Sequence, residues 1–138
     1  MTSTLTKTII INAPRDLVWS FLTDKDRLGL WYHAGETSLA EGQDYALGKS
    51  DSGGAMIWGQ VLTWTPPEKL VTTFCIPNFD GRETTVTWDL SELAGATKLT
   101  LTHTGIVEAG GDAPLGLLQA LDGGWDKHLG DLRKSAQD

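Results

Sequence analysis

The stretch LQALDGGWDKHLGDL, residues 118–132, decides the fold class of this 138-residue chain. Its large apolar side chains recur three or four residues apart, which is the spacing of one face of an α-helix. They are Leu118, Leu121, Trp125, Leu129 and Leu132. Polar residues occupy most other positions, so the pattern predicts an amphipathic helix over residues 113–136. Four glycines in it each cost about 1 kcal/mol relative to Ala; they either let a sheet approach closely or simply weaken the helix.

Before this helix, from about Thr37, the sequence has a period of two, which is typical of β-strands. Short turns rich in Gly, Pro, Asn and Asp separate the strand-like runs. The pattern predicts six strands, near residues 37–40, 44–48, 55–64, 69–76, 83–91 and 97–104. Because the connections are short, consecutive strands are expected to pair as antiparallel hairpins.

Side-chain alternation predicts which residues of the last two strands face the interior. The expected inward set is Val86, Trp88, Leu90, Leu99, Leu101 and His103. Segment 55–64 is different, because Ile57 and Val61 share one parity while Trp58, Leu62 and Trp64 share the other. A β-bulge would explain this pattern, and the inward face of this strand stays open.

The N-terminal region predicts one more strand and two helices. Residues 4–11 alternate and are rich in β-branched side chains. Pro14 suits the first position of a helix, and residues 17–22 continue it with helical spacing. A second short helix carries Leu28 and Trp31 on one face. The chain is therefore expected to form one α+β domain, residues 1–138, in the order strand–helix–helix–six strands–helix with an antiparallel sheet.

Composition excludes several classes of function. The chain has 11 basic and 18 acidic residues, a net charge of −7, which disfavours binding to nucleic acids or anionic membranes. No apolar run approaches the roughly 20 residues of a membrane span. The lone Cys75 permits no internal disulfide and favours a reducing compartment. No signal-peptide core is visible, so a cytoplasmic location is expected.

No motif identifies a reaction, a metal or a cofactor. Residues 50–54, SDSGG, are similar to a protease sequence, but the chain is too short for that double barrel. His33, His103 and His128 are scattered, so no metal site or cofactor is expected. His103 is the first candidate for acid–base catalysis, because it shares the inward parity, and His33 and Tyr45 come next. The alternative for His103 is a strand-end histidine bonded to the backbone.

Six tryptophans are the most informative part of the composition. Large aromatic side chains fill cores, but they also line pockets, where a flat apolar face and one N–H group orient a ligand. Trp125, at the centre of the helical stripe, is expected to face the sheet. Its indole N–H is either a donor to a ligand or simply part of the core.

Several segments, taken in order, resemble one protein family. They are residues 12–19 (NAPRDLVW), 28–32, 59–61, 66–74, 85–90, 97–105 and 124–132. The chain is identified by them as a member of the START-like (Bet v 1-like, SRPBCC) superfamily, in the branch of homologues of the activator of heat-shock-protein-90 ATPase. Tyr32 and Phe74 stand where the family more commonly has Trp. The resemblance covers residues 4–136.

The resemblance implies a helix-grip fold, in which a curved antiparallel sheet wraps a long C-terminal helix and encloses a cavity. The residues expected to line this cavity are Trp31, His33, Tyr45, Phe74, Trp88, His103, Leu121 and Trp125. Three functions stay open. The first is binding of an apolar or amphipathic, lipid-like small molecule by a monomer or homodimer. The others are a cyclase- or hydrolase-like enzyme using His103, and a domain that modulates a chaperone ATPase.

Overall fold

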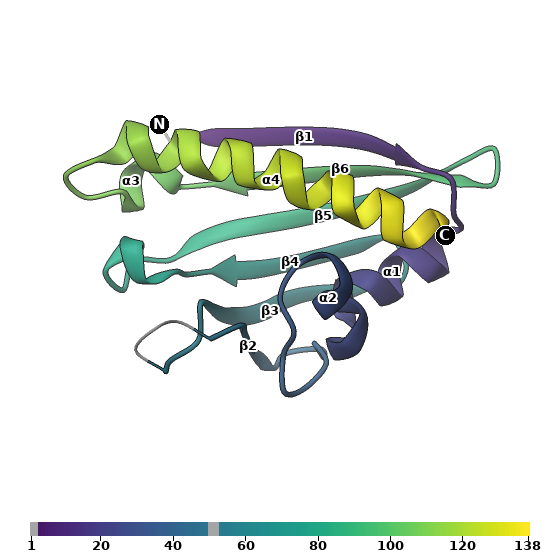
Figure 1. Ribbon diagram of the computed structural model, residues 1–138, viewed down its shortest axis with the longest axis horizontal. Coiled ribbons are helices and arrows are strands. Elements are labelled where there is room, and N and C mark those ends of the chain that lie inside the picture. Colours follow the sequence, from purple (N-terminus) through teal and green to yellow (C-terminus); the bar gives the residue numbers. More distant parts are fainter. Residues whose placement is uncertain (1–2, 50–52) are drawn as a thin grey trace.

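A six-stranded sheet forms one layer of the structure, a computed structural model that describes residues 3–49 and 53–138 (Figure 1). The strands are β1 (Thr4–Ile11), β2 (Asp44–Leu47), β3 (Ile57–Thr65), β4 (Lys69–Phe74), β5 (Thr84–Leu93) and β6 (Ala96–Thr104). Their order across the sheet is β1-β6-β5-β4-β3-β2, and all neighbours are antiparallel. Strands β2 to β6 therefore form a meander, and β1 joins its far edge beside β6.

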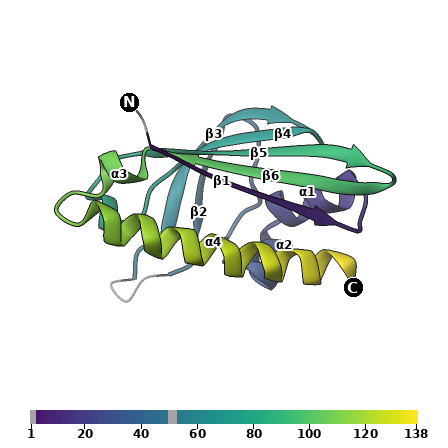
Figure 2. The ribbon, with the colours of Figure 1, turned by 90° about the horizontal axis from the view of Figure 1, so that it is seen from above.

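The helices lie on one face of this sheet. They are α1 (Arg15–Thr23), α2 (Lys25–Trp31), the single turn α3 (Ile106–Ala109) and the long α4 (Pro114–Gln137), with a 3₁₀ turn, η1 (Pro77–Phe79), after β4. Figure 2 shows the sheet curving over α4, with α1 and α2 near the C-terminal end of that helix. The predicted α+β class and the helix-grip arrangement are both confirmed.

The predicted stripe of α4 faces the sheet. Trp125, Leu129 and Leu132 are at most 3% exposed, and Leu118 and Leu121 pack against the core as half-buried side chains. On the edge strand β1, Lys7 forms ion pairs with Asp122 (2.6 Å) and Asp126 (2.9 Å) of α4. These contacts hold the helix over the β1 edge of the sheet.

The glycines of α4 do not bring the sheet close. A Cβ atom added at Gly116, Gly123, Gly124 or Gly130 would have no neighbouring atom within 4 Å. The idea that these residues allow a close approach of the sheet is therefore wrong. What remains is their cost in helix stability and, at Gly124, open space beside the helix.

The predicted inward faces of β5 and β6 are confirmed. All six inward residues are at most 6% exposed, whereas Thr87 and Thr100, which have the opposite parity, are half-buried. The pairs Leu70–Trp88 and Trp88–Leu101 stand directly opposite each other across β4, β5 and β6, so they form a continuous apolar row.

Strand β3 contains the bulge that its mixed pattern suggested. Its register against β4 shifts between Val61 and Thr63. Before the shift Ile57 and Val61 are buried, and after it Trp64 stands opposite the buried Leu70. The bulge moves the inward face from odd to even positions, so each parity faces inward along part of the strand.

One predicted strand does not form. Residues 37–40 are a loop, in which Thr37, Ser38 and Ala40 are exposed and only Leu39 is buried. The Leu39 N–H donates to the Thr23 carbonyl (2.8 Å), at the end of α1, instead of to a strand. Five described strands therefore follow the helices, not six. The short α3 and η1 were not predicted.

Candidate ligand-binding site

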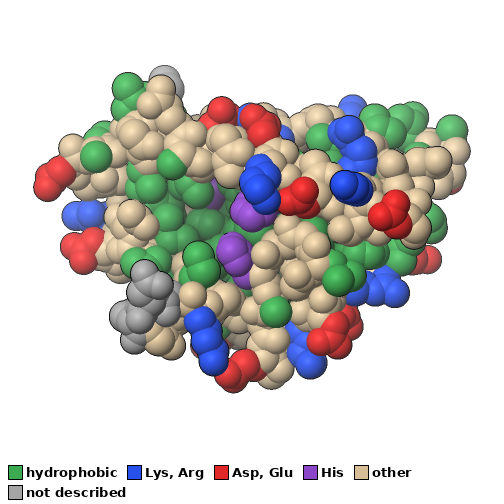
Figure 3. Space-filling model, in the orientation of Figure 1, with side chains coloured by type: hydrophobic (Ala, Val, Ile, Leu, Met, Phe, Trp, Pro, Cys, Tyr) green, Lys and Arg blue, Asp and Glu red, His purple; other side chains and the backbone are tan. Residues whose placement is uncertain are grey.

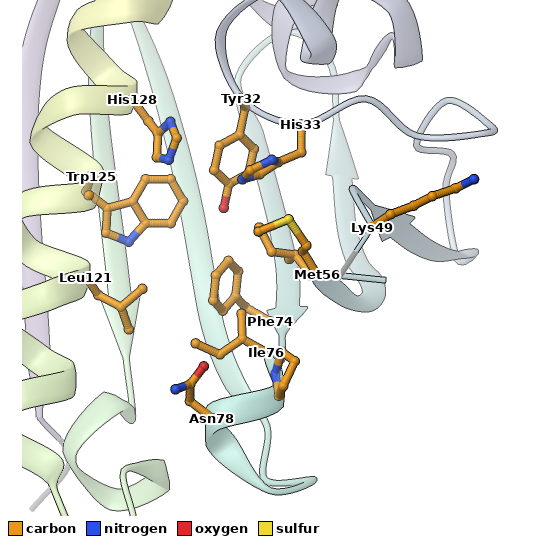
Figure 4. Close-up of a pocket in the computed structure, with 13 residues that line it drawn as sticks. Tyr32, His33, Lys49, Met56, Phe74, Ile76, Asn78, Leu121, Trp125 and His128 are labelled. Carbon is orange, nitrogen blue, oxygen red and sulfur yellow. The ribbon is translucent and has the colours of Figure 1, made fainter. Parts of the chain in front are cut away.

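A pocket of about 510 Å³ opens between α4 and the opposite edge of the sheet (Figure 4). Helix α4 contributes Leu121, Gly124, Trp125 and His128. The segment after α2, the loop before β3 with its first residue, and the end of β4 with η1 supply the rest: Tyr32, His33, Lys49, Met56, Ile57, Phe74, Ile76, Pro77 and Asn78. In Figure 3 this face is hollowed, with hydrophobic side chains inside the hollow and histidine side chains at its edge.

Aromatic rings form the inner wall of the pocket. Tyr32 stacks on Trp125 with ring centroids 5.6 Å apart, and Phe74 lies 6.0 Å from the same indole. Behind these rings a second cavity of only about 30 Å³ remains, enough for about one water molecule. Tryptophan and tyrosine side chains therefore fill the space between sheet and helix, and the larger space lies in front of them.

Three polar side chains cluster in the pocket. The ring of Tyr32 lies 4.7 Å from both His33 and His128, and the two histidines are 5.7 Å apart, all measured between ring centroids. The Tyr32 hydroxyl points into the pocket (Figure 4) and makes no hydrogen bond to the described residues. Since no fully buried side-chain N or O atom among those residues lacks a partner, this hydroxyl is open to the pocket. Hydrogen-bonding capacity is therefore available in an otherwise apolar site.

Burial keeps these three groups uncharged near pH 7. It lowers the pKa of His33 and of His128, and it raises the pKa of Tyr32 well above its ordinary value. For His128, His33 and Lys127 lower the pKa further, while the Trp31 carbonyl and Asp131 act in the opposite direction. The pocket thus presents two neutral imidazoles and a neutral phenol.

His103 lies outside both cavities and is fully hydrogen-bonded. The Trp125 indole N–H donates to His103 Nδ1 (3.0 Å), and an indole N–H can only donate, so Nδ1 is unprotonated. His103 Nε2–H then donates to the Thr84 hydroxyl (2.8 Å), which donates to the Phe74 carbonyl (2.7 Å). Burial lowers the pKa of His103 to about 3.

We call this series of hydrogen bonds the Trp125–His103–Thr84 relay. It corrects two expectations. His103 is not placed to exchange protons with a molecule in the pocket, because both ring nitrogens are occupied and the side chain is 0% exposed. The Trp125 N–H is not available to a ligand, because His103 accepts it. The alternative, a strand-end histidine bonded to the backbone, is closer to what is found, but both hydrogen-bond partners of the ring are side chains.

Tyr45 is likewise occupied at its polar end. Its hydroxyl donates to the Thr73 carbonyl (2.6 Å), and burial raises its pKa to about 12. It stands opposite Gly59, where a Cβ atom would lie 2.2 Å from the same carbonyl oxygen. Only glycine fits there, and the Tyr45 ring contributes an apolar surface rather than a donor.

The structure divides the residues predicted to line a cavity into three groups. His33, Phe74, Leu121 and Trp125 line the large pocket. Trp31, Tyr45 and Trp88 line the small inner cavity, together with Phe74 and Trp125. His103 lines neither.

Sequence reasoning missed Tyr32 and His128 as lining residues. His128 lies three residues after Trp125, so it shares the inward side of α4, and helical spacing could have found it. Tyr32 was noted only as a departure from the family pattern. Its proximity to His128 depends on the packing of α2 against α4, which local patterns do not contain.

Further expectations from the sequence concern metal binding, a membrane span and the SDSGG segment. Within residues 3–49 and 53–138, no three His, Cys, Asp or Glu side chains are grouped so that they could hold a metal ion. No helix there is long and apolar enough to cross a membrane. Of the SDSGG segment, residues 50–52 lie outside the described residues, and Gly53 and Gly54 are exposed.

Comparison with solved structures finds the same fold in proteins of low sequence identity. CalU16 from Micromonospora echinospora is 24% identical with a TM-score of 0.73, over 98% of this chain and 75% of that one. PFC0360w, an HSP90 activator from Plasmodium falciparum, is 24% identical with a TM-score of 0.72, over 96% and 93%.

A third similar structure is the Aha1 dimer from Colwellia psychrerythraea, 16% identical with a TM-score of 0.74, over 98% of this chain and 96% of that one. No curated protein matches the chain. A family match, in contrast, spans residues 12–137, which includes both the pocket and the relay. The chain therefore belongs to the family described as Activator of Hsp90 ATPase homolog 1-like protein.

Proposed function

We propose that this protein binds an apolar or amphipathic small molecule in the pocket between α4 and the segment after α2. The observation that carries the proposal is the pocket of about 510 Å³ with an aromatic wall. This volume is within the range of roughly 300–1,000 Å³ that small-molecule sites occupy. Such sites also combine mainly apolar walls with a few polar groups, as Tyr32, His33 and His128 provide here.

The hydrophobic effect supplies the driving force. A ligand that buries about 200 Å² of apolar surface gains roughly 5 kcal/mol before the costs of association. The inner wall does not need to open, because the ligand occupies the space in front of Tyr32, Phe74 and Trp125. The proposed site is therefore the outer pocket, not the filled interior between sheet and helix.

An enzymatic function has less support. The described lining residues of the pocket include no Asp, Glu, Ser, Thr or Cys, so neither a Ser, Thr or Cys nucleophile nor a carboxylate that orients a histidine is present among them. His103, the candidate acid–base residue, is held in the relay. His33 and His128 are the titratable groups left for a cyclase- or hydrolase-like reaction, with the phenol of Tyr32.

Modulation of a chaperone ATPase is the second candidate. It is supported by the family match and by the likeness to a Plasmodium falciparum HSP90 activator, which the alignment covers over 93% of its length. The test is the steady-state ATPase rate of an Hsp90 protein with increasing amounts of this chain. An unchanged rate at saturating amounts would argue against this function.

The binding function is tested with N-phenyl-1-naphthylamine, an uncharged fluorescent probe of apolar sites. We expect saturable binding that Gly124→Leu weakens by about tenfold or more, a change of ~1.4 kcal/mol, because the new side chain fills the pocket. Gly123→Leu is the matched control, since Gly123 is exposed on the same helix and has equally open surroundings. Equal effects of the two substitutions would place the probe elsewhere.

A further inference from the structure

The pocket provides no fixed charge for an ionic head group. Lys49 is the one Lys or Arg among its described lining residues, and its side chain extends away from the others (Figure 4). None of the described lining residues is an Asp or Glu, and burial lowers the pKa of both His33 and His128. A carboxylate or ammonium group would therefore lose its hydration without gaining a charged partner, which is costly.

His128 instead offers an unused hydrogen-bond acceptor. Its Nδ1 lies 3.4 Å from the Trp31 carbonyl oxygen. Because a carbonyl can only accept, Nδ1 carries the hydrogen and Nε2 of the neutral ring is left with a lone pair. No described residue donates to Nε2, and the side chain is half-buried in the pocket.

Tyr32 complements this acceptor from the other side. Its hydroxyl points into the pocket and makes no hydrogen bond to residues 3–49 or 53–138, and its ring lies 4.7 Å from that of His128. A phenol can donate as well as accept. One ligand hydroxyl can therefore donate to His128 while accepting from Tyr32.

The walls favour a flat ligand. Tyr32, Trp125 and Phe74 present aromatic surfaces, and Met56 adds a polarisable thioether on the opposite side (Figure 4). Aromatic ligands gain from such contacts beyond simple burial of area. Shape and charge thus point to the same class of molecule.

We infer that the pocket recognises an uncharged aromatic molecule through a hydroxyl group that donates a hydrogen bond to Nε2 of His128. This inference rests on the proposed binding function and narrows it. It separates hydroxylated aromatic molecules from fatty acids and other anionic amphiphiles, which are equally apolar but carry a charge.

Recognition of this kind depends on pH. Protonation of His128 turns Nε2 from an acceptor into a donor and gives the ring a positive charge. The ligand hydroxyl can then no longer donate to Nε2, and an anionic ligand gains a charged partner, so the preference for an uncharged ligand over an anionic one falls in acid. The groups that face His128 are His33 and Tyr32 from the segment after α2, and Lys127 and Asp131 on α4. Since burial is the largest effect and lowers the pKa, the acceptor is intact at pH 7.5.

The test uses three probes with one skeleton: naphthalene, 2-naphthol and 2-naphthoate. Binding to the full chain is measured by isothermal titration calorimetry at pH 7.5. We expect 2-naphthol to bind about tenfold more tightly than naphthalene, as one hydrogen bond provides, and 2-naphthoate to bind most weakly. As the pH falls through the lowered pKa of His128, the advantage of 2-naphthol over 2-naphthoate shrinks.

His128→Phe is the decisive variant, because it keeps a ring against Tyr32 and Trp125 but removes the acceptor. The advantage of 2-naphthol over naphthalene, measured as the ratio of their affinities for the same variant, is expected to fall from about tenfold to about one. His128→Gln retains an acceptor and is expected to restore part of this advantage. Thermal melts of both variants establish that they are folded.

The outcomes separate the two claims. If none of the three probes binds, the proposed function fails. If naphthalene and 2-naphthol bind equally well, or if the advantage of 2-naphthol persists in His128→Phe, the pocket function stands and the assignment to His128 is wrong. Tightest binding of 2-naphthoate would likewise overturn the preference for an uncharged ligand.

Discussion

His103 and His128 both lie beside Trp125, with ring centroids 6.0 and 6.5 Å from the indole, but their surroundings are opposite. Both nitrogens of His103 are hydrogen-bonded inside the core. Nδ1 of His128 donates to the Trp31 carbonyl. Nε2 has no donor among the described residues and lies on the pocket side of the indole. The pKa of each is lowered by burial, and that of His103 falls to about 3.

The comparison shows that burial alone does not distinguish a structural histidine from a binding one. What distinguishes them is the number of nitrogens that already have partners. The relay uses all the hydrogen-bonding capacity of His103, so this histidine stabilises the core. Nε2 of His128, in contrast, accepts no hydrogen bond from the described residues, so it is available to a ligand.

Substitution of Trp125 disrupts both the relay and the pocket wall, and it has the largest expected effect. Trp125→Ala should lower the free energy of unfolding by about 3–5 kcal/mol, the range for large aromatic side chains removed from cores, since the indole is 3% exposed. The measurement is chemical denaturation followed by circular dichroism. An unchanged unfolding midpoint would contradict the inward position of this residue.

Acid should destabilise the folded protein through His103, the central residue of the relay. The pKa of His103 is about 3 in the folded protein and near 6.5 when unfolded, so the unfolded state binds more protons as the pH falls. Stability is therefore greatest above pH 6.5 and is lost on acidification, by about 3 kcal/mol between pH 7 and pH 4 from His103 alone. His33 and His128 act in the same direction.

His103→Gln provides the control for this pH dependence, because glutamine does not titrate and can still accept from one neighbour and donate to another. Urea unfolding at pH 7 and pH 4 should show a smaller loss of stability in the variant than in the wild type. Equal losses would mean that His103 is not held as a neutral ring.

Trp125→Phe should separate the relay from the pocket wall. The ring that packs against Tyr32 and Phe74 is largely retained, but His103 Nδ1 loses its donor and becomes a buried, unpaired acceptor. We expect a loss of about 1–3 kcal/mol in stability, with a smaller change in affinity for N-phenyl-1-naphthylamine. Thermal melts and probe titrations measure the two effects. A large loss of affinity at unchanged stability would reverse this assignment.

The smallest expected effect comes from a single methyl group on α4. Gly124→Ala and Gly123→Ala should each raise stability by up to ~1 kcal/mol, because alanine favours the helix and neither site is crowded. Only Gly124 lines the pocket, so only Gly124→Ala should also reduce probe affinity, by about twofold. Lower affinity in both variants would indicate a change in the helix rather than in the pocket.

Local patterns predicted the inward faces of β5 and β6 and the stripe of α4, because periods of 2 and 3.6 residues are properties of neighbouring positions. They failed for residues 37–40, where a buried Leu39 among polar residues imitates a strand while its N–H bonds to Thr23 at the end of α1. Whether such a segment is a strand depends on which backbone groups are free nearby, and this is decided by tertiary contacts.

The site was predictable only in part, for a similar reason. Alternation correctly turned His103 inward, but it could not show that Thr84 and Trp125 occupy its two nitrogens. The cluster of Tyr32, His33 and His128 joins segments that are far apart in the sequence. Only the packing of α2 and α4 on the same sheet makes them neighbours.

The Trp125 indole separates the pocket from His103. Its ring lines the pocket, and its N–H donates to His103 Nδ1. A molecule seated against the indole restricts the small movements that would break this hydrogen bond. The indole N–H of Trp125 exchanges with solvent when this hydrogen bond opens, so its exchange with deuterium should slow when the pocket is filled. The exchange rate of a hydrogen in the relay thus reports occupancy of the pocket, which the relay contacts through the indole ring of Trp125.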